Sequence, residues 1–216
     1  MEERMAGAFR RKAGTSARLL ACTLALAVLC HVARAAAPFP IERLEEGGYI
    51  VMLRHTLAPG VGDPANFRLD DCATQRNLSE EGRAQARRLG ERLRAHGIER
   101  AEIYSSRWCR CLETAELLHL GAVEELPALN SFFSRPAERE PTLEALRAFL
   151  AGLPQDGPPV ILVTHQVTIS AITGHGTTAG EAVVMKADGT RQPPVVGTFE
   201  PNSDAGRHSP EDSTRR

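Results

Sequence analysis

The stretch PVILVT, at residues 159–164, is short, apolar and rich in β-branched residues, which predicts a buried strand. Two further runs, GYIVMLR at residues 48–54 and AEIYS at residues 101–105, predict strands of the same kind. Helical spacing of apolar residues is found over residues 79–97, 108–118, 142–153 and 166–172. Strands that alternate with helices indicate an α/β domain of three layers, a mostly parallel central sheet with helices on both faces.

Several element boundaries are also marked in the sequence. Ser79 is a good N-cap, because the acidic residues that follow it suit the positive end of a helix dipole. Thr142 is expected to cap the helix that ends at Leu153. Residues 57–76 are rich in proline and glycine and predict a loop. A closing hairpin is predicted within residues 181–199.

The two ends of the chain differ from this domain. Residues 1–35 combine a basic start, an apolar run and the small residues of Ala33-Arg34-Ala35, the pattern of a secretory signal that is cleaved after Ala35. The apolar run is shorter than the ~20 residues that a membrane span needs. Residues 36–200 are therefore expected to form a periplasmic or secreted domain without a membrane span. Residues 201–216 are polar, lack periodicity and predict a disordered tail.

The charge of the chain argues against nucleic acid as a partner. The 216 residues carry a formal net charge of −1. Six of the 26 basic and two of the 27 acidic residues lie in residues 1–35, so cleavage leaves 20 basic and 25 acidic residues, a net charge of −5. A nucleic-acid-binding protein would normally be basic. Lys186 is the one lysine after residue 35, so nearly all the remaining positive charge is arginine.

Three cysteines remain after cleavage, namely Cys72, Cys109 and Cys111. In an oxidising compartment they permit one disulfide and leave one thiol. A bond from Cys72 to either Cys109 or Cys111 would tie two loops together, whereas a bond between Cys109 and Cys111 would close a small, strained ring. Their spacing is not that of a zinc site, and no metal is expected.

Polar residues directly follow three predicted strands, at Arg54-His55, Ser105-Ser106-Arg107 and Thr164-His165. In sheets of this type, ligands bind beyond the carboxyl ends of the strands. We therefore expect His55 and His165 to lie at the same edge. Arg107 and Arg110 follow the next strand end, and guanidinium groups bind phosphate oxygens through two hydrogen bonds. The pattern favours an anion pocket, although Arg107 and Arg110 also suit surface salt bridges.

These segments resemble the motifs of the histidine phosphatase (phosphoglycerate mutase-like) superfamily. Leu53-Arg54-His55-Thr56 is similar to the Arg-His-Gly signature of the family, with threonine in the glycine position. Residues 105–115, SSRWCRCLETA, resemble its Ser-Ser-x-x-x-Arg-x-x-x-Thr-Ala segment, which makes Arg110 the second pocket arginine. Val163-Thr164-His165 resembles its later strand-end histidine. The motifs occur in the family's order over roughly residues 48–172, as in a compact, exported, bacterial-type member.

The resemblance implies a metal-independent phosphatase that needs no cofactor. The catalytic set that it implies is His55, Arg54, Arg110 and His165. His55 would attack phosphorus and form a phosphohistidine, while the other three hold the phosphoryl oxygens. Thr56 and Arg107 would add contacts to the substrate, which is expected to be a small phosphomonoester or a phosphorylated surface molecule.

The general acid of many family members has no clear counterpart in the sequence. Asp71, Glu138 and Glu181 are the candidates, and each also fits a solvated or capping carboxylate. A non-catalytic phosphate- or anion-binding module on the same fold is therefore the alternative function. In a third interpretation, the chain is a disulfide-stabilised interaction domain whose histidines are structural. A position of His55 and His165 on opposite sides of the sheet would favour it.

Overall fold

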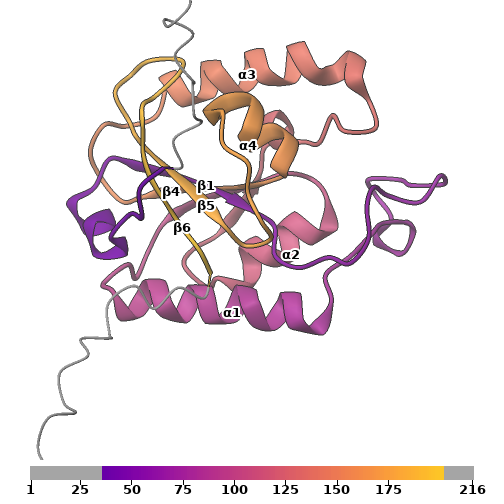
Figure 1. Cartoon of the computed structure of the whole chain (residues 1–216), viewed down its shortest axis with the longest axis horizontal. Coiled ribbons are helices and arrows are strands. Elements are labelled where there is room, and N and C mark those ends of the chain that lie inside the picture. The colour runs from indigo at the N-terminus through magenta and orange to yellow at the C-terminus, as the bar shows by residue number, and fades with distance from the viewer. Residues whose placement is uncertain (1–35, 202–216) are drawn as a thin grey trace, which may run out of the picture. The chain divides into compact units, whose positions relative to one another are not determined.

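The computed structural model describes residues 36–201. The predicted signal segment lies outside the described residues, and so does the predicted tail apart from Pro201. One sheet of six strands forms the centre of the domain, in the order β3-β2-β4-β1-β5-β6 (Figure 1). The strands are β1 Tyr49–Arg54, β2 Glu102–Ser105, β3 Val123–Glu125, β4 Val160–Thr164, β5 Ala182–Lys186 and β6 Val195–Phe199. The helices are α1 Glu80–Ala95, α2 Cys109–Leu117, α3 Arg139–Ala151 and α4 Gln166–Thr173.

The sheet is mostly parallel. Strands β3, β2, β4 and β1 pair in parallel, whereas β5 pairs antiparallel with both β1 and β6. The register places Arg54 of β1 opposite Thr164 of β4. The next residue of each strand, His55 and His165, therefore leaves the sheet at the same edge. The backbone N–H of His55 donates to the Thr164 carbonyl at 3.0 Å, which continues the ladder up to the first histidine.

Helices cover both faces of the sheet. Alternate β1 side chains point to opposite faces, so Val51 and Leu53 join the core under α1 and α2, which includes Leu89 and Ala115. Ile50 and Met52 join the second core, under α3 and α4 (Figure 1). The predicted three-layer α/β architecture is confirmed. Among residues 36–201, no helix is both long and apolar enough to cross a membrane.

The start of α1 is packed tightly against the loop that follows β1. The hydroxyl of Ser79 accepts a hydrogen bond from the Gly82 N–H at 3.1 Å, so the predicted N-cap is confirmed. A Cβ atom at Gly82 would lie 2.1 Å from the Leu57 carbonyl oxygen, which no side chain tolerates. Glycine therefore lets α1 approach the backbone two residues beyond His55.

The start of α3 differs from the sequence prediction. Short 3-10 helices occupy Pro127–Leu129 and Pro136–Glu138, and α3 begins at Arg139. The expected cap, Thr142, lies inside the helix. The proline at position 141 does not break α3, because the first four backbone N–H groups of a helix have no partner within the helix.

Candidate active site

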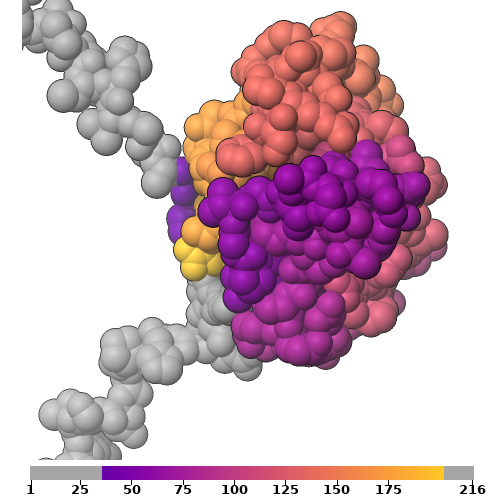
Figure 2. Space-filling model, turned by 90° about the vertical axis from the view of Figure 1, so that its right-hand side faces the viewer, coloured from indigo at the N-terminus to yellow at the C-terminus, as the bar shows by residue number. Residues whose placement is uncertain are grey.

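A cavity of about 540 Å3 lies at the carboxyl ends of β1, β2 and β4. It lies between the loop of residues 55–79 and the segment of residues 126–138 that leads into α3. Figure 2 views this side of the molecule, with the purple loop across its centre below the salmon residues around the start of α3. The predicted residues Arg54, His55, Arg110 and His165 all line the cavity.

His55 is held as a neutral imidazole with one defined tautomer. Its side chain is buried, and its Nδ1 lies 2.8 Å from the Thr56 carbonyl oxygen. Because a carbonyl can only accept, Nδ1 carries the proton and Nε2 carries the lone pair. Burial, followed by the charge of Arg110, lowers the pKa of His55 from 6.5 to about 3. The ring therefore stays uncharged at neutral pH.

His165 lies next to His55, with the two ring centroids 5.6 Å apart. Its Nε2 lies 2.8 Å from the Ser106 hydroxyl, and its ring lies edge-to-face with that of Trp108, with the ring centroids 5.1 Å apart. Burial, then the charge of Arg110, holds the pKa of His165 well below its usual value. The two histidines therefore do not lie on opposite sides of the sheet, the arrangement that would have favoured a purely structural role for them.

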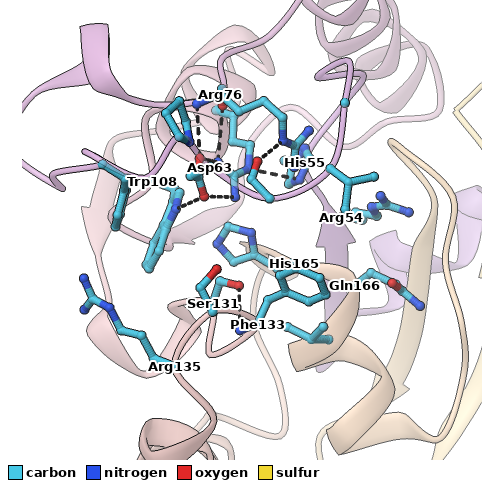
Figure 3. Close-up of a pocket in the computed structure, with 18 of the residues that line it drawn as sticks. Arg54, His55, Asp63, Arg76, Trp108, Ser131, Phe133, Arg135, His165 and Gln166 are labelled. Carbon is cyan, nitrogen blue, oxygen red and sulfur yellow. Dashed lines mark hydrogen bonds and ion pairs between the residues drawn. The ribbon is translucent and has the colours of Figure 1, made fainter.

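Arg110 is anchored by an aspartate that the sequence patterns do not single out. Its Nη1 and Nη2 donate to the two carboxylate oxygens of Asp63 at 2.7 and 3.2 Å, and its Nε donates to His55 Nε2 at 3.2 Å. Figure 3 labels these two partners, Asp63 and His55. Asp63 also accepts from the Trp108 indole N–H and the Arg76 backbone N–H. Burial would raise the pKa of Asp63, but the hydrogen bond and charge of Arg110 outweigh it, so the pKa is lowered.

Arg54 brings a second guanidinium to the cavity from the end of β1. Its Nη1 donates to the Thr177 carbonyl at 2.6 Å. Its Nε is buried and has no hydrogen-bond partner among residues 36–201. Burial and the charge of Arg110 lower the pKa of Arg54. Such a donor suits an anionic ligand oxygen, because a buried N–H without a hydrogen-bond partner is costly.

The charged residues of the cavity are strongly unbalanced. Its lining contains one aspartate, Asp63, and four arginines, at positions 54, 76, 110 and 135. These side chains give the lining a formal charge of +3. In the described part of the chain, no group of three or more His, Cys, Asp or Glu residues is arranged to hold a metal ion. The arrangement suits a multiply charged anion such as a phosphate group.

The sequence leaves the disulfide pairing open, and the structure shows that Cys72 bonds to Cys109, with their Cα atoms 5.8 Å apart. It joins the loop of residues 55–79 to the first residue of α2, next to Trp108 and Arg110. Cys111 is the buried free thiol, 3.5 Å from His165 Nε2. Burial raises the pKa of Cys111 to about 12, so the thiol stays protonated.

Thr56 and Arg107 do not take the substrate-binding positions expected of them. The Thr56 side chain is fully buried and its hydroxyl lies 3.1 Å from that of Thr114, where it joins the β1 end to α2. The exposed Arg107 donates to Glu125 at 3.1 Å on the surface, because residue 107 precedes α2 and points away from the cavity lining.

The three candidate acids also lie away from the cavity lining. Asp71 caps the 3-10 helix Cys72–Thr74 and pairs with Arg68 at 2.5 Å. Glu138 is exposed and pairs with Arg135 at 3.3 Å. Glu181 accepts from the Thr178 N–H at 2.7 Å. Each carboxylate serves a nearby turn or surface arginine, and Asp63 is the carboxylate that reaches the cavity.

Three comparisons place these observations among known proteins. Residues 69–139 match the model of the histidine phosphatase superfamily (branch 1). No curated protein sequence matches the chain significantly. Among solved structures, the protein histidine phosphatase SixA complexed with tungstate is 19% identical, with a TM-score of 0.50 over 71% of this chain and 97% of that one.

Two further structures share the fold. The putative phosphohistidine phosphatase SixA from Nakamurella multipartitia is 19% identical, with a TM-score of 0.52 over 72% of this chain and 96% of that one. The mycobacterial glucosyl-3-phosphoglycerate phosphatase Rv2419c with inorganic phosphate is 18% identical, with a TM-score of 0.51 over 72% and 97%. The common fold and the match over residues 69–139 confirm the resemblance to the histidine phosphatase superfamily.

Proposed function

We propose that the chain is a phosphatase that hydrolyses a small phosphomonoester through a phosphohistidine at His55. The observation that carries the proposal is the neutral His55, whose Nε2 lone pair faces a cavity with a formal charge of +3. The related folds support it, because one solved structure holds tungstate and another holds inorganic phosphate.

The reaction has two steps. His55 Nε2 attacks phosphorus, and a new N–P bond forms as the P–O bond to the leaving group breaks. Water then attacks the phosphohistidine, so the N–P bond breaks, inorganic phosphate forms and His55 regains its lone pair. In the free chain, Arg110 Nε donates to this lone pair at 3.2 Å, a long hydrogen bond. When substrate binds, this N–H donates to a phosphoryl oxygen instead, which leaves the lone pair of His55 free to attack.

The surrounding cations stabilise the charge of the transferred group. The unpartnered Nε of Arg54 binds one phosphoryl oxygen. Arg110 and His165 bind others, and the entering negative charge offsets the burial and repulsion that depress the pKa of His165. Positioned positive charge of this kind supplies most of the catalysis in phosphoryl transfer.

The proton for the leaving group comes from water rather than from a carboxylate. Asp63 is the aspartate of the cavity lining, and Arg110 and its neighbours hold it in the ionised form. A carboxylate held in that form is a poor general acid near neutral pH. Substrates with weakly basic leaving groups are therefore expected to react fastest.

The enzyme assay measures phosphate release from a panel of phosphomonoesters by the purified full chain. We expect turnover in the presence of EDTA, complete loss with His55→Ala, and normal turnover with His96→Ala, a change at an exposed histidine. A phosphohistidine is labile in acid, so the reaction is quenched in base. Mass spectrometry of the denatured protein then detects the intermediate. Binding of phosphate or vanadate without turnover would instead support an anion-binding module.

We also propose that the chain works in the periplasm or outside the cell. The disulfide between the exposed Cys72 and the half-buried Cys109 suits an oxidising compartment. Residues 1–35 carry the signal-like pattern described above. Fractionation of cells that express the full chain or residues 36–216 tests this location. The proposal requires the full chain outside the cytoplasm and the shortened chain within it.

A further inference from the structure

The cavity is larger than a phosphoryl group requires. Its volume of about 540 Å3 falls within the range of roughly 300–1,000 Å3 that is typical of organic ligands. Its inner part consists of His55, His165, Arg110 and Arg54, of which the first three are almost completely buried. The outer part, defined by Val61, Phe67, Phe133 and Arg135, has no role in the phosphate chemistry. It is therefore available for the rest of the substrate.

Apolar side chains form the mouth of this outer part. Val61 is 89% exposed and Phe133 is 56% exposed, although both are large hydrophobic residues. They come from two separate segments, the loop after β1 and the segment before α3 (Figure 3 shows Phe133). Deeper in, the ring of Phe67 stacks on that of Trp108, with centroids 5.2 Å apart. Exposed apolar groups that gather at a cavity are typical of a ligand site.

Arg135 adds a positive charge to this apolar wall. Its guanidinium lies 5.7 Å from the centre of the Phe67 ring, and its side chain is 45% exposed. Its ionic partner is the exposed Glu138 at 3.3 Å, a surface pair that is weak in water. Arg110, in contrast, is paired with the nearly buried Asp63 and with His55 in the free chain, and it serves the phosphoryl group in the inner part. Arg135 is thus able to turn from Glu138 to an anionic ligand group.

We propose that the outer part binds an aromatic leaving group that carries a second anionic group. The flat ring would lie against Phe133 and Phe67, and the distal anion would pair with Arg135. This inference rests on the proposed phosphatase function, because it assigns the inner part to the phosphoryl group. It identifies the substrate class as an aromatic phosphomonoester with a second acidic group.

Non-hydrolysable phosphonates test this proposal without depending on leaving-group chemistry. Titration calorimetry with the full chain compares ethylphosphonate, benzylphosphonate and 4-carboxybenzylphosphonate. We expect benzylphosphonate to bind at least about fivefold more tightly than ethylphosphonate, as aromatic contacts allow. We expect the added carboxylate to tighten binding by about threefold more.

Variants then separate the two contacts. Phe133→Ala is expected to reduce the benzyl-over-ethyl preference to below about twofold, whereas Val196→Ala, at an exposed residue of β6, is the matched control and retains it. Arg135→Gln is expected to abolish the gain from the carboxylate. Arg139→Gln, at an exposed arginine that also pairs with a glutamate, is expected to retain that gain.

The same experiment distinguishes this proposal from the proposed function. Hydrolysis of 4-nitrophenyl phosphate together with equal affinity for ethyl- and benzylphosphonate would overturn the outer-part proposal alone. Selective binding of the aromatic phosphonates without hydrolysis would support the outer part and overturn the phosphatase function. If none of the phosphonates binds and 4-nitrophenyl phosphate is not hydrolysed, both are overturned.

Discussion

Asp63 accepts hydrogen bonds from both terminal nitrogens of Arg110, at 2.7 and 3.2 Å. The two side chains are nearly buried, with 11% and 4% of their surfaces exposed. The two carboxylate oxygens of Asp63 thus bind Arg110 through the same pair of hydrogen bonds that two oxygens of a phosphate would accept. It also lies on the loop that the disulfide ties to α2, so the loop and Arg110 are held together.

Asp63→Asn is expected to destabilise the free protein, because Arg110 loses its negative partner inside the cavity. Loss of a charged hydrogen bond of this kind costs about 1–3 kcal/mol. Inorganic phosphate restores the missing negative charge, so it is expected to raise Tm more in the variant than in the unmodified chain. Differential scanning calorimetry with and without phosphate measures both effects. Asp70→Asn, at a surface aspartate 83% exposed, is the matched control. Equal phosphate effects in the variant and unmodified chain would contradict this role.

The depressed pKa of His55 predicts how stability changes with pH. The unfolded chain protonates this residue near pH 6.5 and the folded chain only near 3, so the unfolded state binds more protons between these values. Stability therefore falls as the pH drops through this window, by about 1.4 kcal/mol per unit for this one group. Urea unfolding at several pH values is expected to show a shallower fall for His55→Gln than for the unmodified chain or His96→Gln. Parallel slopes would mean that His55 is not held neutral.

The disulfide predicts a stability that depends on the redox state. Cys72 and Cys109 are 37 residues apart in sequence, and cross-links that close such loops contribute about 2–4 kcal/mol. Reduction is therefore expected to lower Tm by about 5–15 °C. Calorimetry with and without a thiol reductant measures the change. The double variant Cys72→Ser, Cys109→Ser supplies the control, because its Tm should already be low and should not respond to the reductant. A response in that variant would point to another cause.

The fold and the inner part of the cavity could be predicted because they follow from short-range patterns. Apolar runs mark β1 and β4, and a parallel register necessarily brings the residues after them, His55 and His165, to one edge. The choice of Arg110 over Arg107 comes from the resemblance of residues 105–115 to the family motif. The apolar runs and the motif residues on which these positions depend are visible in the sequence.

The remaining site residues depend on how long loops fold. Asp63 reaches Arg110 across 47 positions, and nothing in the local sequence separates it from Asp70 or Asp71 in the same loop. A carboxylate in the loop after a strand-end histidine is the available signal, and three aspartates share it. Trp108 stands inside the motif as the one tryptophan of the chain, but its contact with Asp63 also depends on the loop.

Trp108 is expected to report ligand binding directly. Its indole N–H donates to Asp63 at 3.0 Å and its ring borders His165, so an anion that displaces Asp63 changes both neighbours. Since the chain has one tryptophan, its fluorescence is specific to this site. Titration with vanadate is expected to change the emission in a saturable way. The Arg54→Ala variant should require a higher vanadate concentration, whereas Arg107→Ala, at a surface arginine outside the cavity, should not. An unchanged emission at saturating vanadate would mean that Asp63 stays in place.

The ionised state of Asp63 predicts a strong dependence on the leaving group. When water supplies the proton, negative charge builds up on the leaving oxygen, so kcat/KM should fall steeply as the pKa of the leaving phenol rises along a series of aryl phosphates. Asp63→Asn is expected to lower kcat/KM for every ester by a similar factor, because it disturbs Arg110 rather than a proton transfer. The slope of log kcat/KM against phenol pKa should therefore be the same in both proteins. If the variant instead lowers kcat/KM selectively for the esters of the phenols with the highest pKa, Asp63 donates the proton to the leaving group. Arg110 then serves to hold Asp63 in place.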